Sequence, residues 1–299
     1  MPLPERFMGE ADPEVPFGEL VANPALRRAP SFQLLGLKPL DLNADALNLA
    51  IRAIHPSLAR TRVEFLGVKL EGVSAEESES IIGLAGWGNH VVKIVGFNHR
   101  IPQNVFDTCV LPAYYSEELK EQAKLHKSHV LITYAGYETD PLEQYVALTI
   151  VASALAKFDG IVLLNDAARC SIPVAALLAQ EPGVDSLDMF RSLPIPMLFG
   201  GFSKIEIEDI PGVWIRTFGN ILLQLPDLAF HAEGHEQGQE TFDLIDTMLA
   251  YMRETGKRLA AGDTMHIEND IYMRVRSRTP EEWYLDSDGE MLVVEKTSP

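Results

Sequence analysis

The sequence predicts an α+β fold in which mixed or mostly antiparallel sheets carry helices packed on one face and contain β-α-β units. Strand-like and helix-like segments alternate along the chain, often in strand–helix–strand order. No repeat with a period of about 20 to 50 residues is present, which argues against a solenoid. With 299 residues, of which 46% are hydrophobic and 23% charged, the chain can bury a sizeable core.

Short apolar runs between turn signals define the strands expected in the first part of the chain. These strands cover residues 32–40, 62–70, 90–97, 129–134 and 161–164. The segment 83–88 (GLAGWG) precedes a strand instead of following one, so it does not fit a dinucleotide-binding motif. We expect a tight turn around Trp87 at this point.

Capping residues, or proline in the first turn, mark the expected helix starts. On this basis helices are expected over residues 44–55, 102–111, 116–126, 141–158 and 172–180. The most apolar stretch, 146–156, has about half the length of a membrane span. It therefore indicates a buried helix.

The character of the sequence changes after Pro194. Strands are expected over residues 196–207, 213–223 and 270–276, with a last hairpin that pairs 283–284 with 291–294. Apolar residues at helical spacing predict an amphipathic helix over 241–259. We expect an extended, proline-rich arm at 1–30, an N-terminal half at 31–110 and a C-terminal half at 111–299.

The chain is strongly acidic, because 25 Lys and Arg against 43 Asp and Glu give a net charge of −18. Phosphate backbones and anionic membranes bind concentrated Lys and Arg, so the composition weighs against nucleic acid and membrane partners. Residues 205–246 hold nine acids and one base. A basic protein partner would meet a complementary potential in this region.

Two cysteines, Cys109 and Cys170, are too few for a disulfide framework. Both lie in apolar contexts, which predicts inert buried thiols. The N-terminal segment shows no basic region followed by an apolar run, so no signal peptide is expected. A cytoplasmic, reducing location is the simplest expectation.

His231 and His235 are four residues apart, a spacing that would place two imidazoles on one face of a helix. With Glu233 or Asp263 as a general base, they define the hypothesis of a metal-assisted hydrolase. Gly234 and Gly238 favour a polar loop instead, and the pattern is not HExxH. No other catalytic or cofactor-binding motif is recognised, so we expect no cofactor.

Five acids within the 205–246 region are the candidate partner-binding residues. Two of them lie two positions apart, which places them on one face of a strand. The five residues are Glu206, Glu208, Asp209, Glu233 and Glu236.

Three stretches carry a resemblance to a known family: PAYYSEELKEQAKLHKSHVLITYAGYETDPLEQ, RTFGNILLQLPDLAF and AAGDTM. Over residues 111–299 the chain resembles the bacterial family called domain of unknown function 4261. The features of that family correspond here to His126, His129, Thr217, Gly219, Pro226, Asp227, Gly262, Asp263 and Thr264. Some members are associated with toxin–immunity and secretion loci, which implies protein binding and not catalysis.

We therefore expect a non-enzymatic protein that binds a protein partner, as an immunity or adaptor protein in a toxin or secretion setting. The metal-assisted hydrolase built on His231 and His235 is the alternative. A third hypothesis is a structural subunit of a homo-oligomer, in which the N-terminal arm exchanges between copies.

Overall fold

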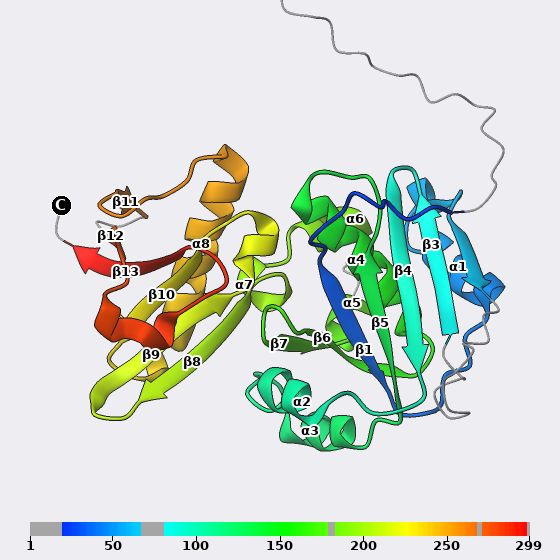
Figure 1. Cartoon of the computed structure of the whole chain (residues 1–299), viewed down its shortest axis with the longest axis horizontal. Helices are drawn as coiled ribbons and strands as arrows, with labels where there is room; N and C mark the ends of the chain where they lie inside the picture. Colours follow the sequence, from blue (N-terminus) through cyan, green and yellow to red (C-terminus); the bar gives the residue numbers. More distant parts are fainter. Residues whose placement is uncertain (1–19, 67–80, 179–182, 268–270, 298–299) are drawn as a thin grey trace, which may run out of the picture.

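The computed structural model describes residues 20–66, 81–178, 183–267 and 271–297, whose strands form two sheets lying side by side (Figure 1). Every strand pair in these ranges is antiparallel except β10 with β13. Helices pack on both sheets. The predicted α+β fold with mostly antiparallel sheets is therefore confirmed.

The first sheet has seven strands in the order β2–β3–β4–β5–β1–β6–β7. Its strands are β1 (Ser31–Gly36), β2 (Arg62–Leu66), β3 (Ile81–Trp87), β4 (His90–Phe97), β5 (Ser128–Tyr134), β6 (Gly160–Asn165) and β7 (Cys170–Pro173). Because β5 lies between β4 and β1, strands from both sides of residue 110 share this sheet. The sheets divide near residue 200, whereas the sequence suggested halves that meet near residue 110.

One face of the first sheet is covered by a layer of helices and helical turns. The layer contains α1 (Ala44–Arg52), η1 (Pro56–Leu58), α4 (Pro141–Leu155), α5 (Ala175–Leu178) and α6 (Ser186–Arg191). The central helix α4 is buried on all sides, and the side chain of Asp140 caps it by accepting from the Leu142 N–H at 2.9 Å. The apolar stretch 146–156 is thus a buried core helix, as predicted.

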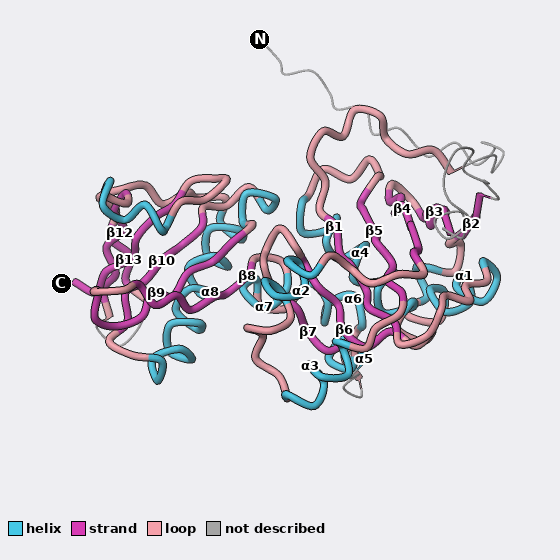
Figure 2. Tube along the Cα trace, turned by 60° about the horizontal axis from the view of Figure 1, so that its bottom comes forward, coloured by secondary structure: helices cyan, strands magenta, loops and turns pink. Residues whose placement is uncertain are grey.

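Two further helices, α2 (Gln103–Cys109) and α3 (Glu117–Lys124), cover the opposite face around β1 and β6. Their buried residues Phe106 and Ala123 pack with Leu35 of β1 and with Val162 and Leu164 of β6. Strand alternation explains the arrangement, because neighbouring residues of one strand point to opposite faces. Figures 1 and 2 show this pair of helices apart from the main helical layer.

The second sheet has six strands in the order β11–β12–β13–β10–β9–β8. They are β8 (Gly201–Ile207), β9 (Ile210–Phe218), β10 (Asp227–Ala232), β11 (Thr264–His266), β12 (Tyr272–Ser277) and β13 (Met291–Thr297). The helical elements of this half are α7 (Ile195–Leu198), η2 (Asn220–Leu223), η3 (His235–Gln237), α8 (Gly238–Thr255) and η4 (Pro280–Leu285).

The two faces of the second sheet are covered differently. The amphipathic helix α8 packs on one face through the buried Ile245, Met248 and Met252, which agrees with the spacing in the sequence. On the opposite face a small cluster that includes Trp214 and Leu285 lies under the short helix η4. We call this opposite side the outer face.

The sheets join where β7 and α7 meet β8, near the middle of the molecule in both views (Figures 1 and 2). The amide of Asn165 donates to the carbonyls of Leu198 at 2.9 Å and Phe199 at 3.2 Å. Gly201 has no room for a Cβ, which would collide with the carbonyl oxygen of Ala168. The close backbone approach and the buried amide fix the connection between the two sheets.

Several expected elements differ from the structure. Residues 83–87 belong to strand β3, since Gly83 allows the Phe65 ring to approach the backbone, and the tight turn expected around Trp87 follows at Gly88, which has a φ of 50°. Residues 196–198 are helical, 220–223 form a helical turn, and 283–284 lie in η4 instead of a hairpin strand. Strands β7 and β10 were not foreseen. Because β13 pairs with β12 and β10, the predicted last hairpin is wrong.

The predicted N-terminal arm is described from residue 20 onward, and residues 1–19 lie outside the described ranges. Asn23 ties the arm to the end of β5. Its backbone N–H donates to Ala135 O at 2.7 Å, and its side-chain amide donates to Gly136 O at 3.1 Å. Residues 20–30 therefore contact the body of their own chain.

Candidate functional site

The five acids predicted to bind a partner gather at one end of the second sheet. Glu206, Glu208 and Asp209 lie at the β8–β9 turn, and Glu233 and Glu236 lie between β10 and α8. The two connections are neighbours because the last residue of β10 pairs with β9 just after that turn. All five side chains belong to exposed residues, and we call this group the acidic end.

Two hydrogen bonds join His235, in the connection between β10 and α8, to residues of β8. The Nε2 of His235 donates to Glu206 Oε1 at 2.8 Å, and Lys204 Nζ donates to the backbone carbonyl of His235 at 2.8 Å. The side chains of Glu206 and His235 are 72% and 56% exposed, so this pair is screened by water and holds the turn only weakly. The acids therefore stay accessible to a partner.

The metal-site hypothesis for His231 and His235 finds no support in the geometry. His231 lies on β10 and its Nε2 donates to Pro211 O at 2.9 Å, whereas the Nε2 of His235 is bonded to Glu206. Within the described ranges, no group of three or more His, Cys, Asp or Glu side chains is arranged to hold a metal ion. The helix that would align the two rings is also missing, because β10 ends before the glycine-containing turn.

A row of aromatic rings crosses the outer face toward the acidic end. Trp283 contacts Tyr284 at 5.9 Å between ring centroids, Tyr284 contacts Trp214 at 5.8 Å, and Trp214 contacts His231 at 4.8 Å. We call these four residues the aromatic row. Its two ends are open to solvent, because Trp283 is 69% exposed and His231 is also exposed.

The backbone on both sides of Trp283 is anchored to the sheet. Glu282 receives two hydrogen bonds of 2.7 Å from Arg276, and Arg216 Nη1 donates to the carbonyls of Tyr284 at 3.2 Å and Asp286 at 3.1 Å. The exposed indole therefore projects from a fixed segment. A fixed aromatic side chain loses little conformational entropy when a partner covers it.

Beneath the outer face lies a buried polar centre made of Thr217, Asn220, Asp227 and Ser287. Asp227 Oδ1 accepts from Thr217 Oγ1 and from the Asn220 backbone N–H, each at 3.2 Å, and its Oδ2 accepts from Ser287 Oγ. Burial raises the pKa of Asp227. Because Asp227 on β10 accepts from donors on β9, on η2 and on the segment after η4, its geometry supports a role in holding these elements together.

Arg216 is fully buried beside the polar centre. Its guanidinium stacks on the Phe218 ring at 4.0 Å, and the guanidinium of Arg169 lies over the same ring at 4.2 Å. Burial lowers the pKa of Arg216 to about 10, so the side chain remains charged at neutral pH. Since its Nη1 bonds two carbonyls at the end of η4, Arg216 fixes the segment that presents Trp283.

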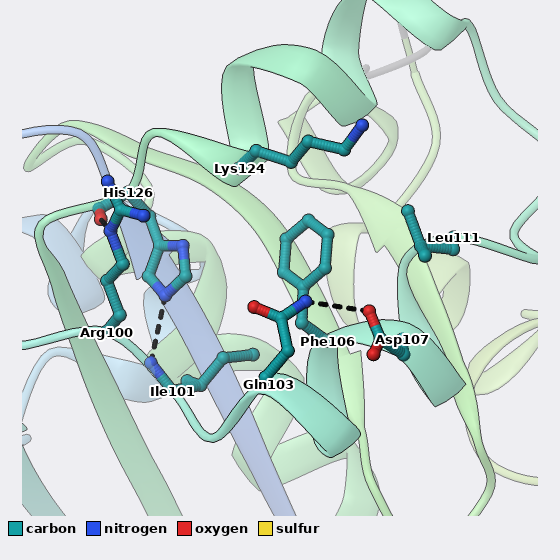
Figure 3. Close-up of a pocket in the computed structure, with 8 residues that line it drawn as sticks. All are labelled: Arg100, Ile101, Gln103, Phe106, Asp107, Leu111, Lys124 and His126. Carbon is teal, nitrogen blue, oxygen red and sulfur yellow. Dashed lines mark hydrogen bonds between the residues drawn. The ribbon is translucent and has the colours of Figure 1, made fainter.

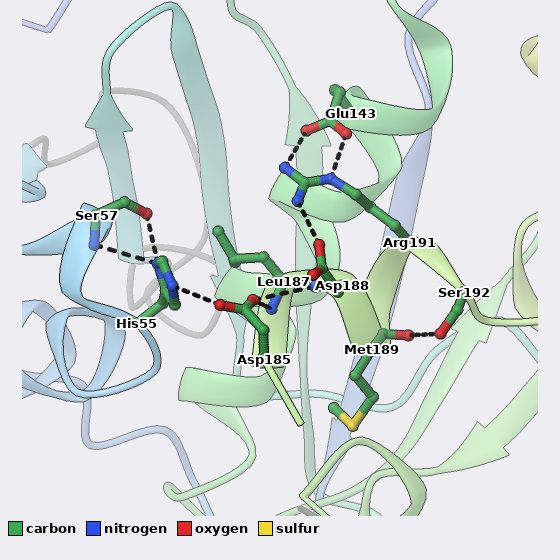
Figure 4. A network of polar contacts seen from close by, with 9 residues as sticks. All are labelled: His55, Ser57, Glu143, Asp185, Leu187, Asp188, Met189, Arg191 and Ser192. Carbon is green, nitrogen blue, oxygen red and sulfur yellow. Dashed lines mark hydrogen bonds and ion pairs between the residues drawn. The ribbon is translucent and has the colours of Figure 1, made fainter. Parts of the chain in front are cut away.

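A Ser–His–Asp chain of hydrogen bonds lies at the edge of the first sheet's helical layer (Figure 4). Ser57 Oγ is 2.7 Å from His55 Nδ1, and His55 Nε2 is 2.8 Å from Asp185 Oδ2. The order of groups is that of a catalytic triad, which would also need free N–H donors for an oxyanion. The nearest backbone N–H groups, of Leu58 and Ala59, are already bonded within η1.

Two of these three side chains, His55 and Asp185, act as helix caps. His55 Nδ1 accepts from the Ser57 N–H at 3.2 Å, and Asp185 Oδ1 accepts from the Leu187 N–H at 2.8 Å at the start of α6. Helix α6 is further tied to α4 by Arg191, which donates to both carboxylate oxygens of Glu143 at 2.7 and 3.1 Å (Figure 4). These hydrogen bonds thus join η1 to the start of α6, and α6 to α4.

His126 and His129 belong to the expected family features, and both are buried, His126 between α3 and β5 and His129 on β5 itself. His126 Nδ1 donates to Ala123 O at 2.7 Å, while its Nε2 accepts from the Ile101 N–H at 2.9 Å. Burial lowers the pKa of both imidazoles. His126 thus caps a carbonyl at the end of α3, and the second bond requires the neutral ring.

Both cysteines are free and buried, as the sequence predicted. Burial raises the pKa of Cys109 to about 12 and also raises that of Cys170. Neither thiol is therefore a candidate nucleophile. At the other family features, Gly262 adopts a φ of 103°, and Asp263 Oδ2 accepts from the Ala260 N–H at 2.8 Å. This is the geometry of a polar turn between α8 and β11.

The comparisons with known proteins point to the second sheet. The model of a family described as a domain of unknown function (DUF4261) matches residues 216–292. This segment starts at Arg216 and contains the polar centre, β10, α8 and η4. The resemblance recognised in the sequence is confirmed over this segment. No curated protein and no solved structure matches the chain.

Sequence reasoning found the acidic end but missed the aromatic row and the anchoring by Arg216. The sequence marks Trp214 and Trp283 as core or interface anchors, but no periodicity shows that one is buried and the other exposed. A signal for the start of η4 was present at Thr279-Pro280-Glu281-Glu282, which fits a capping box with proline in the first turn.

In the described ranges no helix is long and apolar enough to cross a membrane.

Proposed function

We propose that this protein works without catalysis, by binding a basic protein partner through the outer face and the acidic end of the second sheet. The observation that carries the proposal is the exposed indole of Trp283, at one end of an aromatic row whose other end, the exposed His231, lies on β10 just before the turn that holds Glu233 and Glu236. Trp and Tyr anchors surrounded by charged residues are typical of protein interfaces.

The charge of the surface indicates the chemistry of the partner. An acidic surface attracts a basic partner over a long range and repels acidic competitors, which raises the association rate. An immunity or adaptor role toward a basic toxin is the form of this function that the family resemblance supports. We place it in the cytoplasm, where buried free thiols such as Cys109 and Cys170 persist.

Charge reversal at the acidic end tests the proposal. The variant Glu208→Lys/Glu233→Lys/Glu236→Lys is compared with Asp41→Lys/Glu118→Lys/Glu254→Lys, which changes the net charge equally at exposed sites elsewhere. Asp209 is left unchanged because its φ of 66° is costly for most side chains.

Each tagged variant is used to capture proteins from the native cell at low salt, with mass spectrometry as the readout. We expect the first variant to lose a basic protein that the unmodified chain and the second variant both retain. Capture should also fall at high salt, because screening weakens contacts between exposed charges. Equal capture by both variants would contradict the proposal.

A further inference from the structure

A pocket of about 260 Å³ lies on the first half of the molecule, between α2, α3 and the loop after β4 (Figure 3). Arg100 lies at one end of this pocket, Asp107 and Leu111 lie at the other, and the Phe106 ring is between them. The pocket is separate from the acidic end and the aromatic row, which belong to the second sheet.

The wall of the pocket is rigid at His126. Its two ring nitrogens are bonded to Ala123 O and the Ile101 N–H, and the ring lies parallel to Phe106 with 6.0 Å between centroids. These bonds connect the end of α3 with the loop before α2. The pocket is therefore preformed, as ligand sites usually are.

Arg100 supplies a cation whose own carboxylate partner is missing among the described residues. Its Nε donates to the backbone carbonyl of His126 at 3.1 Å, which orients the guanidinium at the pocket. The other cation at the rim, Lys124, already pairs with Glu121 at 2.5 Å. Although the chain has a net charge of −18, the guanidinium of Arg100 attracts an anion at this point. The two oxygens of a carboxylate match the parallel N–H donors of a guanidinium.

The remaining lining limits the kind of anion. Phe106, Ile101 and Leu111 offer apolar contact, so a ligand with an apolar body buries surface here. Asp107 lines the opposite end and is held by the Gln103 amide at 2.7 Å. Its negative charge disfavours a dianion such as a phosphate group. We propose that this pocket binds a small monocarboxylate with an apolar body.

Binding is tested with 4-fluorophenylacetate, which is titrated against the full chain and followed by fluorine NMR. The neutral 4-fluorophenylacetamide and the dianionic 4-fluorophenylphosphonate serve as matched probes. The amide loses the charge-assisted contact with Arg100, and the dianionic phosphonate is repelled by Asp107, so we expect the carboxylate to bind at least about tenfold more tightly than either. Equal affinity of the acid and the amide, tighter binding of the phosphonate, or no binding of the acid would overturn the proposal.

Variants assign the binding to this pocket. Arg100→Gln should weaken binding of the carboxylate about tenfold, whereas Arg258→Gln, which removes the same charge at an exposed position after α8, should leave it unchanged. Leu111→Trp fills the pocket and should abolish binding. Since Leu111 is 40% exposed, thermal melting should confirm that this variant folds. Equal losses in the Arg100 and Arg258 variants, or full binding by the filled pocket, would contradict the assignment.

Discussion

The two sheets of this protein are built from similar antiparallel pairings but differ in how their faces are covered. The first sheet carries the long helix α4, which is buried on all sides, and two more helices cover part of its opposite face. The second sheet has one long helix on one face, and among the described residues only the short η4 covers its outer face. The comparison suggests that the first half is chiefly a scaffold, while the second half presents a recognition surface.

The charges follow the same division. Residues 201–299 hold 19 acids and 9 bases, a net charge of −10, whereas the longer segment 31–200 has a net charge of −6. The buried imidazole of His126 lies in the first half, and the exposed indole of Trp283 lies in the second. Substitutions in an apolar, fully packed core usually lower stability. Substitutions on an exposed charged surface leave stability nearly unchanged but weaken binding.

The largest loss of stability is expected at the buried polar centre of the second half. In Asp227→Ala three hydrogen-bond donors lose their acceptor inside the protein, which should lower the free energy of unfolding by about 4 kcal/mol. Asp227→Asn retains an acceptor and should cost less than half as much. Urea unfolding measures both, and equal losses in the two variants would show that the hydrogen bonds contribute little.

A slightly smaller loss is expected in the scaffold of the first half. Leu148 is fully buried in α4, so Leu148→Ala should lower the free energy of unfolding by about 3 kcal/mol through the lost contacts and the cavity. Leu49 on α1 is 66% exposed, and Leu49→Ala should change that free energy by less than about 0.5 kcal/mol. Similar values for the two variants would mean that α4 is not the packed centre.

The pH dependence of stability should expose the neutral His126. Burial lowers its pKa in the folded state, so the unfolded chain takes up the proton first as the pH falls below about 6.5. The contribution of the neutral His126 ring to stability is complete above that pH. It is lost as the pH falls through the lowered pKa of the folded state. Protonation also removes the acceptor for the Ile101 N–H, a loss of about 1 to 2 kcal/mol.

His126→Phe keeps a ring beside Phe106 but cannot be protonated. The decrease in unfolding free energy between pH 7.5 and pH 5.0 should therefore be smaller in this variant than in the unmodified chain. An unchanged decrease would assign the pH dependence to other groups, such as the buried His129, whose pKa burial also lowers.

The fold class could be predicted from the sequence because alternation and capping signals are local. Asn43, Ser116 and Asp140 cap α1, α3 and α4 through the side-chain bonds that their residue types favour. Strand β10 could not be predicted in this way, because it lies between β13 and β9 and is buried at nearly every position. Such a strand lacks the alternation of apolar and polar residues that marks a half-exposed one.

The candidate site could be predicted only in part, for a similar reason. A run of acids is visible in the sequence wherever it lies, so the acidic end was found. The aromatic row joins residues from β9, β10 and η4, and its members are far apart in the sequence. The metal hypothesis for His231 and His235 rested on helical spacing, which a strand followed by a turn does not provide.

The central claim, that the outer face of the second sheet binds a partner, is tested most directly by comparing two exposed aromatic residues. Trp283 belongs to the aromatic row, and Tyr114, between α2 and α3, is fully exposed on the first half. Both changes to alanine should alter the unfolding free energy by less than about 0.5 kcal/mol. Capture of the basic partner at low salt should fall at least about tenfold in Trp283→Ala and stay unchanged in Tyr114→Ala. Equal capture by the two variants would contradict the account.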